Sequence, residues 1–197
     1  AAAAKQGAGE GLVNADCLDC HTDPGNKRAL KDRPPLELFN TNRFAQSVHG
    51  KLNCVDCHVG IKDLVHESKL PPPQCVNCHE PRPSHEQAAK DYATSIHGVS
   101  QKLGASGSAT CADCHSLSGR AEVHSMRPAK DPESPVFKLN LPRTCAKCHS
   151  NAGLNKEYQM KYPDVASQYN DSIHGRALLK MGLIVAPSCN DCHGVHE

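Results

Sequence analysis

The sequence predicts a mostly irregular fold with short α-helices and little or no β-sheet. Its 197 residues are only 38% hydrophobic, a share that includes 12 Cys, and they contain no Trp, 3 Phe and 4 Tyr. The 14 Pro and 14 Gly interrupt the chain, and no alternating apolar pattern persists beyond a few residues. Something other than side chains is therefore expected to fill much of the interior.

The charge balance excludes some classes of partner. Lys and Arg number 22 and Asp and Glu number 21, for a net charge of +1. No basic surplus indicates nucleic acid, and no apolar run approaches the roughly 20 residues of a transmembrane helix. We therefore expect no nucleic-acid partner and no transmembrane segment in this chain. The first residue is Ala1 rather than Met, which fits either a mature protein after signal cleavage or a fragment.

All 12 Cys fall into six Cys-x-x-Cys pairs, and His follows every pair directly. The pairs are Cys17/Cys20, Cys54/Cys57, Cys75/Cys78, Cys111/Cys114, Cys145/Cys148 and Cys189/Cys192. The following residues are His21, His58, His79, His115, His149 and His193. The chain has 13 His, so six matches in six by chance have a probability of about 10⁻⁷, and the His belongs to the motif.

Cys-x-x-Cys-His is the attachment signature of c-type haem. Its two thiols form thioethers to the two vinyl groups of one macrocycle, and the His becomes the proximal iron ligand. The sequence therefore predicts six c-type haems, whose flat apolar rings would supply the missing core. Each oxidised haem with its two propionates contributes about −1, which lowers the net charge from +1 to about −5.

Other uses of paired Cys explain the pattern less well. Zinc ribbons use two Cys-x-x-Cys pairs per metal, so six pairs could form three zinc sites. A disulfide framework would suit a secreted chain. Both leave the invariable His unexplained. A thioredoxin-like redox motif requires a βαβ context, which the sequence lacks.

Two further patterns repeat around these sites. Aromatic-x-x-Ser-(Val or Ile)-His-Gly occurs at residues 44–50, 92–98 and 169–175, before the sites at Cys54, Cys111 and Cys189. Val-His-(Glu or Ser) follows the same sites at residues 65–67, 123–125 and 195–197. We infer repeat units at about 44–79, 92–149 and 169–197 in a single multihaem domain, 1–197, with a first haem site at 17–21 before them.

The repeats supply six further His as distal iron ligands: His49, His66, His97, His124, His174 and His196. His85 has no counterpart in the other units and is the alternative ligand. His196 lies only three residues after His193, so it cannot easily reach the opposite face of the same haem. We therefore expect distal ligands to cross between sites. The sequence stops directly after Val-His, which suggests a longer natural chain. One repeat His would then belong to a seventh haem, and His85 could be recruited.

The helices are expected at the repeated His motifs. Residues 42–49, 84–97 and 163–174 are predicted to be helical, with the motif Gly as the helix stop, and a short helix is predicted over 176–181. Ser84 and Gln87 have the spacing of a capping box. Residues 131–141 are predicted to form a solvated loop within the second unit.

These motifs make the chain resemble the multihaem c-type cytochromes over residues 17–197. The resemblance implies a bacterial or archaeal protein of the periplasm or cell exterior, with closely spaced bis-His haems of low potential. Persistence of 12 Cys also fits a compartment outside the cytosol. The implied partners are redox proteins, and copies of the chain itself or a membrane-anchored cytochrome are further candidates.

Two classes of function follow. Two His on every iron would leave no position for a substrate, which predicts an electron carrier or conduit with no catalytic residue: a soluble shuttle, a subunit of a complex or a filament protomer. The alternative is a multihaem oxidoreductase of small nitrogen or sulfur oxyanions, which would need one open iron. All six attachment motifs are of the same regular form, which favours the carrier.

Overall fold

The computed structural model describes residues 11–26, 38–66 and 70–196. Within these ranges the chain forms short helices joined by irregular segments, and its only β-type pairing is an isolated antiparallel bridge between Ser116 and Met126. The predicted fold class is confirmed. Ala1, Glu67 and Glu197, which the sequence patterns include, lie outside the described residues.

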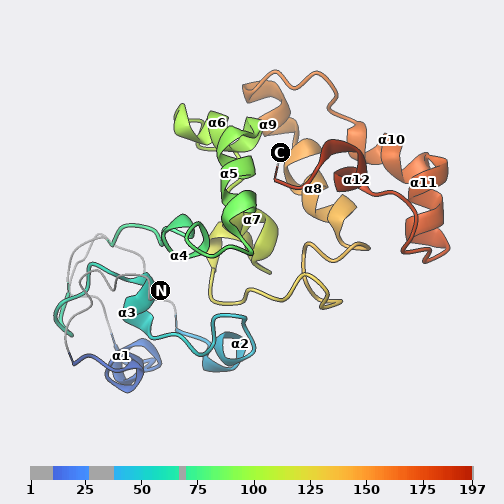
Figure 1. Ribbon diagram of the computed structural model, residues 1–197. Helices are drawn as coiled ribbons and strands as arrows, with labels where there is room; N and C mark the ends of the chain where they lie inside the picture. Colours follow the sequence, from blue (N-terminus) through green and yellow to red (C-terminus); the bar gives the residue numbers. More distant parts are fainter. Residues whose placement is uncertain (1–10, 27–37, 67–69, 197) are drawn as a thin grey trace.

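The helices follow the chain from one end of the molecule to the other. Figure 1 shows α1 to α3 at one end, α4 to α7 in the middle, and α8 to α12 beyond them. Their bounds are α1 (Asn14–His21), α2 (Thr41–Ala45), α3 (Cys54–Cys57), α4 (Val76–His79), α5 (Glu86–Thr94), α6 (Ile96–Lys102), α7 (Cys111–His115), η1 (Gly119–Ala121), α8 (Leu141–His149), α9 (Ala152–Glu157), α10 (Val165–Asp171), α11 (Ile173–Gly175), the π-helix η2 (Arg176–Lys180) and α12 (Cys189–His193).

Three of the attachment motifs begin with a capping box. In α3, the Asp56 carboxylate accepts a hydrogen bond from the Asn53 backbone N–H at 2.8 Å. Asp113 does the same for Thr110 in α7 and Asp191 for Ser188 in α12, at 2.6 Å each. Each box satisfies backbone N–H groups that have no partner within the helix. The signal was readable in the sequence as Asn, Thr or Ser three residues before Asp.

The prediction that the glycine of the Ser-x-His-Gly motif ends a helix is wrong. In units two and three the helix ends at the motif serine, and the glycine lies in the next helix. Ser95 ends α5 and begins α6, because its hydroxyl accepts a hydrogen bond from the Gly98 backbone N–H at 3.1 Å. Ser172 similarly caps α11 through Gly175 at 3.1 Å. A capping serine breaks a continuous helix into two. The motif is therefore a helix-to-helix junction in units two and three, while in unit one it forms a turn after α2.

The motif glycine is required by close backbone contact. A Cβ atom at Gly98 would lie 2.0 Å from the Tyr92 carbonyl oxygen, and one at Gly175 would lie 2.0 Å from that of Tyr169. Neither glycine has a positive φ, so space rather than backbone strain selects it. The junction brings the motif glycine against the backbone of the preceding helix.

Two local predictions are also corrected. Ser84 and Gln87 form no capping box: Ser84 contacts the His85 ring, and Gln87 donates to Asp91. Residues 131–141 are not simply solvated, because Ser134 is fully buried and the Asn140 side chain donates to the backbone of Pro132 and Ser134. The segment folds on itself and leads into α8.

The described residues bury few hydrophobic side chains, namely those of Val55, Ile61, Ala112, Leu178 and Ala186. In the repeated motif, Ile96 and Ile173 expose 73% and 79% of their surface. A chain of this length would ordinarily bury about 70% of its surface. The helices thus enclose little core of their own, as the composition indicates. None of the described helices is long and apolar enough to cross a membrane.

Candidate haem-binding sites

The structure brings the motif imidazoles together in pairs. Each pair joins the His of one Cys-x-x-Cys-His motif to a His of the repeats. The five pairs in the described residues, with the distance between ring centroids, are His21–His66 at 6.3 Å, His49–His79 at 6.0 Å, His58–His124 at 6.1 Å, His97–His149 at 6.2 Å and His115–His196 at 5.9 Å.

This spacing fits one metal ion between two imidazoles. A metal–imidazole nitrogen bond is about 2 Å long, so an ion held between two rings separates their centroids by roughly 6 Å. The five observed separations lie between 5.9 and 6.3 Å. No group of three or more His, Cys, Asp or Glu among the described residues could hold a metal by itself. Each pair could supply the two protein ligands of a haem iron, with the Cys beside it as tethers.

His85 is less well placed than His49 for the site at His79. The ring of His85 lies edge-on to that of His79 at 4.9 Å, too close for an ion between them, whereas His49 lies at 6.0 Å. The Nδ1 atom of His85 also lies 3.3 Å from the Ser84 hydroxyl. The arrangement favours His49 as the second ligand.

The pairing follows one rule within a unit. We call the first attachment site of a unit its leading site (Cys54, Cys111, Cys189) and the second its trailing site (Cys75, Cys145). The Ser-x-His-Gly imidazole faces the trailing site of its own unit. This rule gives His49–His79 in unit one and His97–His149 in unit two.

The Val-His imidazole of each unit faces an attachment site that precedes that unit in the chain. His124 of unit two faces His58 of the leading site of unit one, and His196 of unit three faces His115 of the leading site of unit two. His66 of unit one faces His21 in the site before the units. In Figure 1 the segment after α12 runs back toward the middle group of helices, which includes α7 with His115. The repeat imidazoles thus cross between sites, as the short His193–His196 spacing suggested.

His124 is oriented by its neighbours. Its Nδ1 atom lies 3.2 Å from the Glu122 carboxylate, and the edges of Phe39 and Phe44 approach its ring at 4.9 and 6.1 Å. A carboxylate on Nδ1 fixes the tautomer that presents Nε2 to a metal. The aromatic residue of the unit-one motif, Phe44, therefore helps to position the imidazole that faces His58.

Burial favours the neutral form, which is the form that binds a metal, at several of these imidazoles. Loss of solvation is the main cause that lowers the pKa of five of them, and nearby imidazoles or Arg82 add to it. Protonated His cannot ligate iron. The affected residues are His49, His58, His79, His97 and His115.

Contacts between cysteines arrange the six attachment motifs in chain order. The thiols of the first Cys lie close enough to influence each other's pKa between motifs one and two, three and four, and five and six. The second Cys of motif two lies near that of motif three, and the same holds for motifs four and five. These neighbouring pairs of the first Cys are Cys17–Cys54, Cys75–Cys111 and Cys145–Cys189, and those of the second Cys are Cys57–Cys78 and Cys114–Cys148.

These contacts do not extend to two of the predicted haem tethers, Cys20 and Cys192. Both are exposed, and within the described residues neither is joined to a cysteine of another motif. They are the second Cys of the first and of the last motif, where the alternating contacts end. The Cys20 carbonyl instead accepts a hydrogen bond from the Asn26 side chain at 3.0 Å, and Cys192 lies near Tyr169. Their tethering role depends on the motif alone and stays a prediction.

The aromatic residue of the motif anchors the leading site in units two and three. The Tyr92 hydroxyl donates to the Ala109 carbonyl at 2.8 Å, and that of Tyr169 donates to the Pro187 carbonyl at 2.8 Å. Both carbonyls lie two residues before the first Cys of the leading site. In unit one, Phe44 has no hydroxyl, and the Asn14 amide donates to the equivalent Leu52 carbonyl at 3.1 Å.

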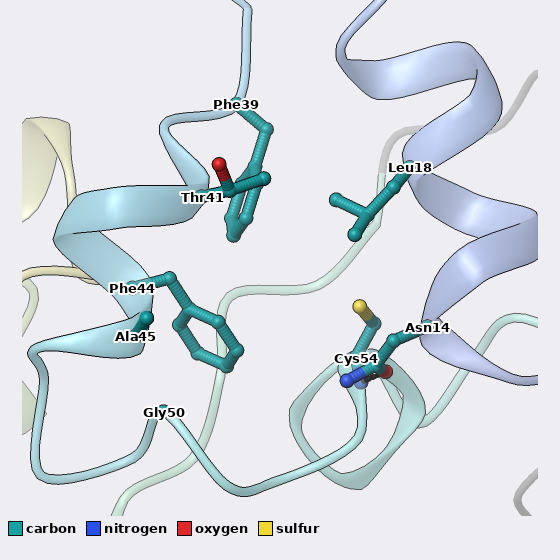
Figure 2. A pocket seen from close by; sticks show the side chains of 8 residues that line it. All are labelled: Asn14, Leu18, Phe39, Thr41, Phe44, Ala45, Gly50 and Cys54. Atoms are coloured by element: carbon teal, nitrogen blue, oxygen red, sulfur yellow. Dashed lines mark hydrogen bonds between the residues drawn. The ribbon is translucent and has the colours of Figure 1, made fainter.

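An apolar pocket lies between the first two attachment motifs. It has a volume of about 160 Å³ and is lined by Asn14, Leu18, Phe39, Thr41, Phe44, Ala45, Gly50 and Cys54. Figure 2 shows Leu18, Phe39 and Phe44 converging on the space beside the Cys54 thiol. The pocket is smaller than the roughly 300–1,000 Å³ of an enclosed ligand site, so it suits one face of a large apolar group tethered at Cys54.

His174 and His193 are the predicted metal ligands that the structure does not bring together with another imidazole. Both are exposed, and no ring contact joins either to another His in the described residues. All 13 His of the chain lie within those residues. The sequence alone placed these two among the ligands without showing where their partners lie.

Comparison with known proteins identifies a family for most of these motifs. A sequence profile of the class III cytochrome c family matches residues 27–149. This stretch contains the sites at Cys54, Cys75, Cys111 and Cys145 and the first two repeat units. Neither the curated proteins nor the solved structures gave a match.

Proposed function

Since the chain belongs to the class III cytochrome c family, whose members are multihaem electron carriers, we propose that it conducts electrons along a row of six covalently attached c-type haems. The observation that carries this proposal is the spacing of five imidazole pairs, each between 5.9 and 6.3 Å and each beside a Cys-x-x-Cys pair. A soluble carrier, a complex subunit and a filament protomer are all compatible with it.

The chain's residues would have two tasks. The 12 Cys would tether the six groups, with Cys20 and Cys192 at the two ends of the row, and the His of each motif would be the proximal ligand. His49, His66, His97, His124 and His196 would be second ligands, at the sites of His79, His21, His149, His58 and His115. When bound, haem c supplies an iron that accepts and releases one electron. At the five sites with paired imidazoles, no position would remain on the iron for a substrate, which would confine those sites to electron transfer.

The cysteine contacts support a row in chain order. In every consecutive pair of motifs, from Cys17 to Cys189, a cysteine of one motif lies near a cysteine of the next. Imidazoles that cross between units join each unit to the one before it, which supports residues 1–197 as a single domain. We infer that electrons would enter at one end of the row and leave at the other.

Class III cytochromes are typically periplasmic. We propose that this protein works in the periplasm or at the cell exterior of a bacterium or archaeon, with redox proteins as its partners. A second copy or a membrane-anchored cytochrome would suit either end of a row. The near-neutral net charge of +1 gives no support to a nucleic-acid partner.

The alternative function is reduction or oxidation of a small nitrogen or sulfur oxyanion. It requires an iron with a single protein ligand, and within the described residues only His193 of the six proximal His lacks a second imidazole at ligating distance. The lack of a second imidazole at His193 is the observation that supports this alternative.

An anaerobic reductive titration with optical detection tests the carrier. We expect six electrons per chain and the low-spin spectrum of bis-His c-type haem at most sites. A parallel assay with a reduced dye and nitrite or sulfite should show no turnover above the dye alone. Sustained turnover would establish the oxyanion reductase, and uptake of no electrons would exclude both functions.

A further inference from the structure

The pairing rule leaves two imidazoles, His193 and His174, without a partner in the described part of the chain. In each case the rule also says which element of a repeat unit the partner would belong to. By this rule the leading site of unit three, His193, takes the Val-His imidazole of a following unit. His174, as a Ser-x-His-Gly imidazole, takes the trailing site of unit three. Residues 1–197 contain neither element.

Residues 1–197 do not offer a substitute for either partner. The three Val-His imidazoles already face His21, His58 and His115. Both trailing sites, at His79 and His149, already face the imidazole of their own unit. The remaining His85 lies against His79 at 4.9 Å.

The geometry at the two imidazoles is that of half-sites open to a partner. His193 and His174 are both exposed, and so are the neighbouring side chains of Val195 at 54% and Ile173 at 79%. The leading site of unit three nevertheless has the same local structure as the others. The Asp191 carboxylate accepts a hydrogen bond from the Ser188 backbone N–H and pairs with Lys138 at 2.6 Å. The Tyr169 hydroxyl donates to the Pro187 carbonyl. The local structure of a ligand site is thus present without its second ligand.

We propose that His193 and His174 are halves of two haem sites completed by a further repeat unit outside residues 1–197. That partner would bring a Val-His imidazole to the iron at His193 and a Cys-x-x-Cys-His motif to His174. The row of sites would then continue past α12, and the position at His193 would be a junction between units rather than a substrate site. This inference rests on the proposed function.

Electron paramagnetic resonance of the oxidised 197-residue holoprotein tests the proposal. The protein is purified without imidazole and measured as a monomer. We expect five low-spin ferric haems and one high-spin haem per chain, and titration with free imidazole should convert the high-spin signal to low-spin. The C189A/C192A variant should lose that signal, whereas a C111A/C114A variant should keep it.

Two single variants distinguish the proposal from ligation within the chain. H174A should leave the spin count unchanged, because His174 would ligate no iron of its own chain. H124A is the matched control and should add one high-spin haem, at His58. Six low-spin haems in the monomer, a new high-spin haem in H174A, or a high-spin signal that survives in C189A/C192A would each overturn the proposal.

Different outcomes of the measurement report on the source of the partner unit and on the proposed function. Conversion of the high-spin haem to low-spin at high protein concentration would show that an imidazole of a second copy leaves its own pair to reach His193, which would overturn the further repeat unit as the partner. Persistence at every concentration is the result expected if the completing unit is absent from residues 1–197, whether it belongs to a longer form of this chain or to another polypeptide. Absence of covalently bound haem would instead refute the proposed function, whereas six low-spin haems would refute only the inference about His193 and His174.

Discussion

An imidazole in this protein acquires its role from the ring that faces it. His49 and His85 both contact His79, but only His49 lies at a separation that suits a shared metal, 6.0 Å against 4.9 Å. His124 shows what fixes such a ring, since Glu122 holds its Nδ1 side and two Phe edges hold its plane. Ligand identity is therefore a matter of spacing and support.

Replacement of one facing imidazole should change one haem. His97 faces His149 at 6.2 Å, so H97M should give the haem at Cys145 a Met/His ligand set, which raises its potential. A spectroelectrochemical titration should show one haem shifted upward and the others nearly unchanged. H85M is the control and should shift none. An unaltered set of potentials in H97M would show that His97 is not a ligand.

The Tyr92 hydroxyl should contribute to stability through the hydrogen bond that it donates to the Ala109 carbonyl or to the Gln101 side-chain oxygen, each at 2.8 Å. Y92F should lower the free energy of unfolding by about 1 kcal/mol, the usual net value of one hydrogen bond. Y162F is a matched control, because Tyr162 is 61% exposed and makes no hydrogen bond among the described contacts. Denaturant unfolding followed by circular dichroism measures both. Equal stability of Y92F and the parent would contradict the anchoring role.

The same tyrosine should make stability depend on alkaline pH. Burial is the main cause that raises the pKa of Tyr92 to about 12, whereas in the unfolded chain it is about 10. The unfolded state therefore ionises first, so this contribution is complete below pH 10 and is lost as pH rises toward 12. The stability difference between the parent and Y92F should shrink over that interval. A constant difference would contradict the raised pKa.

At the scale of elements, the Ser-x-His-Gly junction sets the position of the motif imidazole. Serine closes one helix and caps the next, and glycine permits the two helices to approach. Because the backbone carbonyl of Tyr92 stands where a Cβ would be, the structure has little room to relax at this point.

G98A should therefore be strongly destabilising. Its Cβ would lie 2.0 Å from the Tyr92 oxygen, and overpacking of this kind costs about 1–3 kcal/mol or more. G60A is the matched control, since the nearest atoms to its Cβ would be 3.9 Å away. Thermal unfolding of both variants tests the difference. A G98A variant as stable as G60A would contradict the close approach.

Sequence reasoning reached the attachment motifs and the list of repeat imidazoles but not the junction. Cys-x-x-Cys-His is a local pattern, so Cys17 to His193 could be read directly. The role of Gly98 depends on contact with Tyr92 across two helices, and a helix-stop rule misassigned it. The pairs that involve His66, His124 and His196 depend on contacts across whole units, which spacing could only suggest. The capping boxes at Asp56, Asp113 and Asp191 were readable and were missed.

At the scale of the whole molecule, the number of bound haems determines the net charge. The polypeptide carries +1, and six oxidised haems would lower this to about −5. The holoprotein should therefore migrate as an anion at pH 7, and full reduction should increase its mobility further. Native electrophoresis under oxidising and reducing conditions measures this. Migration as a near-neutral protein in both states would contradict six haems.

The same scale explains how a chain with little apolar mass can fold. Val55, Ile61, Ala112, Leu178 and Ala186 are the hydrophobic side chains buried in the described residues, and this is a small core for the chain's length. Six apolar macrocycles along the helices would cover residues such as Ile96 and Ile173. Folding and attachment should accordingly be coupled.

The most direct test of six haems on six motifs is peptide mapping of the purified holoprotein by mass spectrometry. Protease digestion should yield six peptides, each with one Cys-x-x-Cys-His and each heavier by one covalently bound haem. The peptides that contain Cys20 and Cys192 matter most, because no contact with another motif supports these two tethers. Peptides with free thiols, disulfides or bound zinc at any of the six motifs would contradict the account at that site, and their presence at all six would refute it.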